Sequence, residues 1–184
     1  MERDFSEATQ IFLKQFLEIL EDFKKETRFQ IFLLNKEGEL INKLEGVQPA
    51  CKFILATPIG RTRCKDCFKI GFLITKTQRN SLFLECYANF AICWLPIIRN
   101  DSFVGAIIMC GKRFEREEGK GKMMEKFNNL VEELEIFEKK EFFQRLDQTE
   151  IITEEEFKNY VERLKKLMEI LTEIAQTPIK EIFG

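Results

Sequence analysis

The chain has 184 residues, with 29 Lys and Arg against 31 Asp and Glu, which gives a formal net charge of -2. This length predicts one domain with a substantial apolar core, and the near-neutral charge argues against a dedicated nucleic-acid binder. Histidine is absent. Its absence excludes catalytic sites that need an imidazole and leaves cysteine, carboxylate and backbone groups as the candidate metal ligands.

The cellular location follows from the absence of targeting signals. No run of residues approaches the roughly 18 apolar residues that a membrane span needs, and the charged N-terminus lacks the pattern of a secretory signal. We therefore expect a cytoplasmic protein without membrane contact, in which thiols stay reduced. The six cysteines then indicate metal ligands, redox thiols or small core residues before they indicate disulfides.

The N-terminal part of the chain predicts a helix followed by a hairpin. Apolar residues recur at helical spacing over 5–25, and Asp4 is the expected N-cap. Strands are expected at 29–34 and 39–44. The turn between them ends at Gly38, which supplies the positive φ that a short hairpin loop needs.

An irregular helical insert follows at 47–80. Pro49 suits the first turn of one helix, the segment 58–60 breaks it, and a second helical piece is expected at about 63–77. After the insert we expect three strands, at 82–88, 90–98 and 103–110. The order of elements fits an α+β domain with a five-stranded antiparallel sheet, similar in plan to small sensory modules of the PAS and GAF type.

Two helices are expected to close the chain, at about 121–140 and 153–176. The second begins with the capping box of Thr153 and Glu156. Its apolar residues form a seam with heptad spacing. The seam consists of Phe157, Val161, Leu164, Met168, Leu171 and Ala175. It fits either a helix packed on its own domain or a dimerising, signal-transmitting helix, and we predict a homodimer through it.

Four cysteines form the most informative pattern, with the spacing C-x12-C-x2-C-x18-C. They are Cys51, Cys64, Cys67 and Cys86. The two residues between Cys64 and Cys67 let both thiolates reach one metal ion, and a set of four suits zinc or an iron–sulfur cluster. Neighbouring basic residues would offset the thiolate charge. These are Arg61, Arg63 and Lys65. Unligated core thiols and disulfides are the alternatives, and Cys93 and Cys110 are expected to line the core or a pocket.

A ligand pocket is expected between the sheet and the helical insert. Strand alternation turns either Ile92, Trp94 and Pro96 or their alternate neighbours toward it. We favour Trp94 near the pocket rim, because its indole N–H needs a partner. The candidate ligand contacts are Tyr87, Trp94, Cys110 and Lys112. An apolar pocket with few polar groups suits a small, mostly hydrophobic molecule.

Several short motifs in a fixed order resemble the PocR-type sensory domain, over roughly residues 8 to 115. The matching positions are Cys51, Cys64, Cys86, Pro96, Gly105, Cys110 and Gly111. The resemblance implies a PAS/GAF-like module that senses small organic molecules and is usually joined to kinases, diguanylate cyclases or DNA-binding domains. On this basis we assign 1–118 to the sensory domain and 119–184 to a C-terminal signalling or dimerisation extension.

Two functional hypotheses remain open at this point. The first is a cytoplasmic sensory domain that binds a small organic ligand and acts through its C-terminal helices on a separate effector protein or an effector domain outside this sequence. The second is a metal- or redox-responsive switch, in which the four cysteines hold zinc or an iron–sulfur cluster and are the sensing element. We expect no enzymatic activity, because no set of catalytic acid, base and nucleophile is visible.

Overall fold

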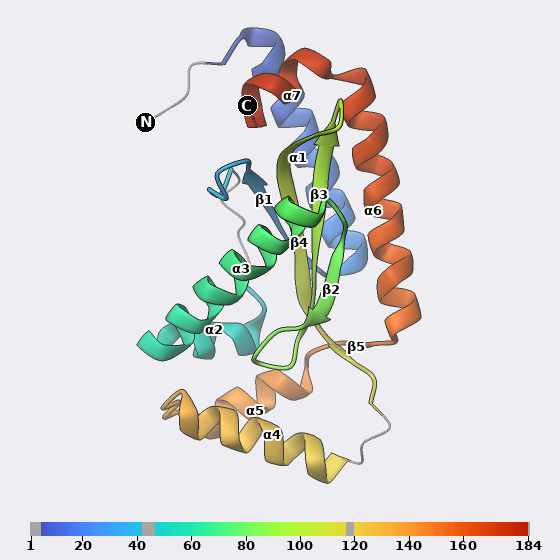
Figure 1. The fold of residues 1–184 in the computed structure, drawn as a ribbon. Coiled ribbons are helices and arrows are strands. Elements are labelled where there is room, and N and C mark those ends of the chain that lie inside the picture. Colours follow the sequence, from blue (N-terminus) through green and yellow to red (C-terminus); the bar gives the residue numbers. More distant parts are fainter. Residues whose placement is uncertain (1–4, 42–46, 117–119, 184) are drawn as a thin grey trace.

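A five-stranded sheet runs through the middle of the molecule, and helices cover both of its faces (Figure 1). The computed structural model describes residues 5–41, 47–116 and 120–183. Four strands are antiparallel in the order β1-β4-β3-β2. They are β1 (Gln30–Asn35), β2 (Leu82–Glu85), β3 (Ala91–Arg99) and β4 (Ser102–Phe114). The short β5 (Ile151–Ile152) pairs in parallel with the end of β4.

The α+β class predicted from the sequence is confirmed, but one strand of the sheet differs from the prediction. Gly38 has the expected positive φ, at 84°. Among the described residues, the expected return strand at 39–44 is limited to a single bridge between Leu34 and Leu40. The segment 42–46 lies outside the described residues. The fifth strand is β5, which comes from far along the chain.

The helical insert consists of α2 (Pro49–Ala56) and α3 (Pro58–Gln78). The expected break between the two helices is present, since α2 ends at Ala56 and Thr57 has an extended backbone, but α3 begins at Pro58 and not at about residue 63. Proline fits the first helical position, where its missing N–H has no acceptor to lose. Thr57 caps the helix, and its hydroxyl accepts a hydrogen bond from the Gly60 N–H at 3.0 Å.

The C-terminal helices also divide differently. The single helix expected at 121–140 is two helices, α4 (Lys120–Glu133) and α5 (Lys139–Asp147), with Glu135 between them at a left-handed φ of 56°. The next helix is confirmed as α6 (Glu154–Ile174), with its capping box. It is followed by α7 (Gln176–Phe183). No helix in the described ranges is long and apolar enough to cross a bilayer.

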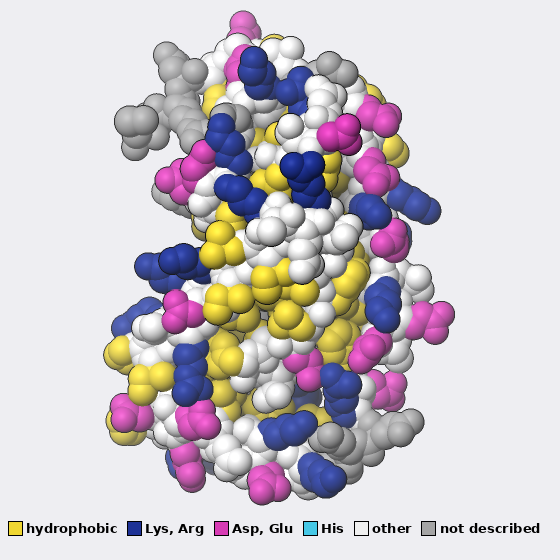
Figure 2. Space-filling view, in the orientation of Figure 1, with side chains coloured by type: hydrophobic (Ala, Val, Ile, Leu, Met, Phe, Trp, Pro, Cys, Tyr) yellow, Lys and Arg dark blue, Asp and Glu magenta, His cyan; other side chains and the backbone are white. Residues whose placement is uncertain are grey.

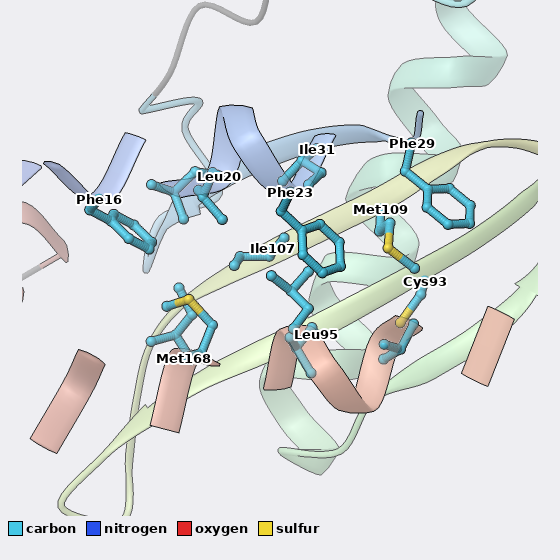
Figure 3. Close-up of a cluster of buried hydrophobic side chains, with 14 of the residues drawn as sticks. Phe16, Leu20, Phe23, Phe29, Ile31, Cys93, Leu95, Ile107, Met109 and Met168 are labelled. Carbon is cyan, nitrogen blue, oxygen red and sulfur yellow. The ribbon is translucent and has the colours of Figure 1, made fainter. Parts of the chain in front are cut away.

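The first helix is confirmed as α1 (Glu7–Thr27), with Ser6 as its N-cap; the expected cap, Asp4, lies outside the described residues. Together with α6 and α7, α1 covers the sheet face opposite α3 (Figure 1). The main core lies between these helices and that face (Figure 3). It includes Phe16, Leu20, Phe29, Ile31, Cys93, Leu95, Ile107, Met109 and Met168. Ile92 and Trp94 lie on the opposite face, toward α3.

The heptad seam of α6 packs inside its own domain, so its assignment to a dimer interface is wrong. Phe157 is 1% exposed, and its ring contacts those of Phe29, Phe83 and Phe114 at centroid distances of 5.4, 6.3 and 5.4 Å. Four other seam residues belong to the same core cluster, and Leu171 packs against it while partly buried. A seam already covered by the sheet has no free surface for a second copy. The homodimer itself remains a prediction.

A second apolar cluster attaches α4 and α5 to the insert. It joins Ile54 of α2 and Phe90, which precedes β3, with Phe127 of α4 and Phe142 of α5. The Phe142 ring lies 6.3 Å from that of Phe53 and 6.4 Å from that of Phe127. The two helices thereby lie beyond the end of β2, below the sheet in Figure 1.

Candidate functional site

The four cysteines of the spaced pattern come from three elements that meet at α3. Cys51 lies on α2, Cys64 and Cys67 lie one turn apart on α3, and Cys86 follows β2. Burial raises the pKa of each thiol, to about 12 for Cys86. Negative charge on the neighbouring thiols of Cys86 and Cys64 would raise the pKa of Cys51 further. Negative charge on any of these four thiols would likewise raise the pKa of Cys110 on β4, which burial already raises.

No disulfide joins these cysteines. All six cysteines are free, and a thiol with a raised pKa is a weak nucleophile at neutral pH. In the described part of the chain, no three Cys, Asp or Glu side chains are arranged so that they could hold a metal ion. A metal would therefore have to draw the thiols closer together and displace their protons.

Arg61 and Arg63, which lie close to Cys64 in the sequence, have partners other than the thiols. Arg61 donates hydrogen bonds at 3.0 Å to the carbonyls of Leu55 and Ala56, which are the exposed C-terminal carbonyls of α2. Arg63 forms an ion pair with Glu133 of α4 at 2.6 Å. Arg61 therefore stabilises the C-terminal end of α2, and Arg63 links α3 to α4. Among the described residues, neither guanidinium forms a hydrogen bond with a cysteine.

Tyr87 binds to the start of α3. Its hydroxyl donates a hydrogen bond to the Gly60 carbonyl at 3.0 Å and lies 3.4 Å from the Cys64 sulfur. Burial and the nearby Cys64 raise the pKa of the phenol. The polar group that we expected to contact a ligand therefore already has a protein partner.

Trp94 does not lie at a pocket rim, contrary to our expectation. It is 1% exposed and lies on β3 beneath α3. A Cβ atom at Gly71 would lie 2.2 Å from Trp94 Cε2, so the helix backbone rests directly on the indole. Within the described ranges of the chain, the indole N–H has no hydrogen-bond partner. Close packing by the helix, rather than contact with a pocket, determines its surroundings.

Cys110 and Lys112 point to opposite faces of the sheet. The Cys110 thiol donates a hydrogen bond to Gln30 Oε1 at 3.7 Å on the α3 side. Lys112 instead forms an ion pair with Glu150 at 2.8 Å and lies 4.6 Å from the centre of the Phe29 ring. Gly111, at φ 108°, is the extra residue of a β-bulge that interrupts the alternation. The four candidate ligand residues therefore do not form one site.

A groove of about 580 Å³ lies between β1, its turn and α3. We call it the β1–α3 groove. Phe32 and Phe68 stand in its wall with ring centroids 5.3 Å apart, and Phe72 and Leu34 are next to them. Three exposed lysines also line it. They are Lys65, Lys69 and Lys76. Figure 2 shows hydrophobic side chains exposed on this side of the molecule beside Lys and Arg side chains.

The groove residues were missed by the sequence analysis, although a signal for them exists. Phe68 and Phe72 are four residues apart, and the lysines at 65, 69 and 76 follow the same helix at spacings of four and seven. Such a pattern predicts an apolar stripe with a basic edge. It does not indicate that the stripe faces the edge strand β1 and leaves space there.

Comparison with known proteins gives one match. The model of a family described as the sensory domain found in PocR matches residues 10–176. Among curated proteins and solved structures no significant match is found. The family match extends through α6, past the boundary that we predicted at residue 118, and the division into two parts stays a prediction. Since the match covers most of the sequence, the chain belongs to the family of PocR sensory domains.

Proposed function

We propose that this sensory domain binds a small amphipathic molecule, with an apolar body and a negatively charged group, in the β1–α3 groove. The observation that carries the proposal is the combination of aromatic walls and exposed lysines in one groove of suitable volume. Ligand sites are commonly apolar concavities of roughly 300–1,000 Å³ with few polar groups. Membership in a sensory family favours a binding role over an enzymatic one.

The charged residues of the described chain that line the groove are three lysines and Glu37, and this balance supports an anionic group on the ligand. Lys76 is held in place, because its ammonium group donates to the Lys36 carbonyl at 2.6 Å and lies 5.8 Å from the centre of the Phe72 ring. Lys65 and Lys69 stand one turn apart on the exposed side of α3. A ligand whose apolar part contacts Phe32 and Phe68 could place a carboxylate or sulfonate near these ammonium groups.

Strand β1 gives the groove a route to the C-terminal helices. Phe32 and Leu34 face the groove, whereas Ile31 and Leu33 lie in the main core that includes Ile179 and Phe183 of α7. The contact beside β1 is close, since a Cβ atom at Gly105 would lie 2.6 Å from Phe183 Cδ1. A ligand that shifts β1 would therefore also shift α7, and we propose this as the path of the signal.

The groove can be tested with 1-anilinonaphthalene-8-sulfonate, an aromatic anion whose fluorescence rises on binding. Phe68→Ala is expected to weaken binding about tenfold, because removing one aromatic wall costs about 1.4 kcal/mol of contact energy. The matched control is Ile70→Ala, which alters an exposed residue of the same helix outside the groove and should leave binding unchanged. Equal affinity in Phe68→Ala and wild type would contradict the assignment of the groove.

The charge requirement is tested by competition. Hexanoate should displace the probe better than hexanol of equal chain length, and Lys65→Gln with Lys69→Gln should abolish that difference. Lys166→Gln, an exposed lysine on α6, serves as the control. If the acid and the alcohol displaced the probe equally well from wild type, the groove would have no preference for anions. That result would refute the proposed negative charge on the ligand.

As a second candidate, we propose a metal-responsive switch in which Cys51, Cys64, Cys67 and Cys86 close around an ion. The packing of the four cysteines supports this candidate, because Cys51, Cys64 and Cys86 contact one apolar cluster, and Cys86 also contacts the neighbouring cluster together with Cys67. Metal binding would deprotonate the thiols and tie α2 to α3 and the end of β2.

Elemental analysis of protein purified anaerobically tests this candidate. The expected result is stoichiometric zinc, or iron with sulfide and a brown colour lost in air. Cys64→Ser should lose most of the metal, whereas Cys93→Ala should keep it, because Cys93 lies in the core on the other face of the sheet. Metal-free wild-type protein would refute the switch and leave the groove proposal unaffected.

A further inference from the structure

Arg113, near the end of β4, carries a buried charge that the protein satisfies poorly. The residue is 9% exposed, and its buried Nε–H has no hydrogen-bond partner among the residues that the structure describes. The Nη1 group donates to the thioether sulfur of Met123 at 3.1 Å, and the guanidinium carbon lies 5.8 Å from the centre of the Phe127 ring. A thioether is a weak acceptor, whereas a guanidinium offers five donors.

The electrostatic environment of Arg113 is also unfavourable. Burial lowers the pKa of the guanidinium, and the charge of Asp147 only partly opposes this effect. Burying a charge without a hydrogen-bonded counterion is costly, so natural proteins pair buried arginines with acceptors of matching geometry. An anion that supplied two acceptor oxygens to this guanidinium would relieve the cost.

A small cavity lies beside Arg113, between the sheet and α4. Its volume is about 20 Å³, and the charged residues of the described chain that line it are Arg113, Arg116, Lys126 and Glu85. Arg116 is held by Glu85 at 2.9 Å and by Glu154 at 3.4 Å. The rest of the lining is Asn89, Phe114, Met123 and Phe127. The cavity therefore places the poorly satisfied guanidinium of Arg113 beside apolar walls.

We propose that this cavity binds the carboxylate group of a small organic acid, with Arg113 as the donor. A cavity of this size holds about one or two oxygen-sized atoms, which suits the flat head of a carboxylate better than a tetrahedral phosphate. The site joins β4 to α4, so an occupant would fix the α4–α5 pair against the sheet. It shares no lining residue with the β1–α3 groove, and either proposal can fail without the other.

Acetate is the probe for this site, and sodium chloride at equal ionic strength is the reference. In spectra of the arginine Nε–H groups, acetate should shift one resonance, that of Arg113, along a saturable curve. The dissociation constant is expected on the order of 1 mM, given the few atoms of the ligand. Chloride should leave the resonance in place. This measurement uses the wild-type chain and needs no variant to fold.

Thermal unfolding gives the second measurement. Acetate should raise the Tm of wild type, since a ligand that binds only the folded state stabilises it. Arg113→Met should abolish the shift, whereas Arg163→Met, which removes an exposed arginine that also lies over aromatic rings, should retain it. Equal shifts with chloride and acetate, an acetate effect that persists in Arg113→Met, or the absence of any shifting Nε–H resonance would each overturn the proposal.

Discussion

Gly71→Ala is expected to lower the free energy of unfolding by about 3 kcal/mol, the upper end of the usual cost of overpacking. A methyl group at this position would lie 2.2, 2.4 and 2.5 Å from three atoms of the Trp94 indole. Trp94 is 1% exposed and enclosed by Phe72, Ile92 and Ile108, so it has no free space into which to move. Helix α3 must therefore lift away from the sheet, although alanine is the better helix former.

The matched control is Gly121→Ala, because Gly121 also lies in a helix and a Cβ atom there would have no neighbour within 4 Å. Urea unfolding followed by the fluorescence of the single Trp measures both variants. Gly121→Ala should be neutral or slightly stabilising. If Gly71→Ala were as stable as the control, the close approach of α3 to the indole would be refuted.

Phe157→Ala is expected to cost about 3–5 kcal/mol, the range for removing a fully buried phenylalanine. Phe157 contacts Phe29 of the α1–β1 link, Phe83 of β2 and Phe114 of β4, so its ring joins α6 to three separate parts of the sheet layer. Phe137→Ala is the control of identical chemistry, because Phe137 is 88% exposed in the link between α4 and α5. Its loss should change stability by less than about 0.5 kcal/mol.

The same variant separates the two interpretations of the α6 seam. Because the seam packs on the chain's own sheet, Phe157→Ala should lose stability in urea while light scattering reports the same oligomeric state as wild type. A variant that kept wild-type stability and dissociated from a dimer to a folded monomer would contradict the packing of α6 and restore the intermolecular seam.

The proposed sites lie around the same helices, on the side of the sheet opposite the main core or at its end. The β1–α3 groove lies on one edge of α3, the thiols lie near its N-terminal half, and the Arg113 cavity lies at α4. Helices α2, α3, α4 and α5 also form the smaller apolar clusters of the molecule. Smaller buried clusters open more easily than a large core, which suits a region that responds to a ligand.

Local sequence patterns were sufficient for most elements of the fold. Apolar spacing predicted α1 and α6, the capping box placed the start of α6 at Thr153, and Gly38 placed the first turn. The alternation of side-chain direction along a strand divided the residues of β3 between the two faces of the sheet. These features depend on neighbours within about four residues, so their physical causes are contained in short segments. The family resemblance at 8–115 depended on the same kind of ordered short motifs, and the family match confirms it.

The site could not be derived in this way, because its features depend on which surfaces meet. The bulge at Gly111 turns Lys112 away from Cys110, although strict alternation places both on one face. The seam of α6 is apolar whether it meets the sheet or a second copy, and only the competing packing of α1 and α7 assigns it to the chain's own core. Likewise, nothing within four residues of Arg113 indicates that α4 buries its charge beside a cavity. A pattern specifies which side of an element avoids water, whereas the element that covers it is selected by the packing of the whole chain.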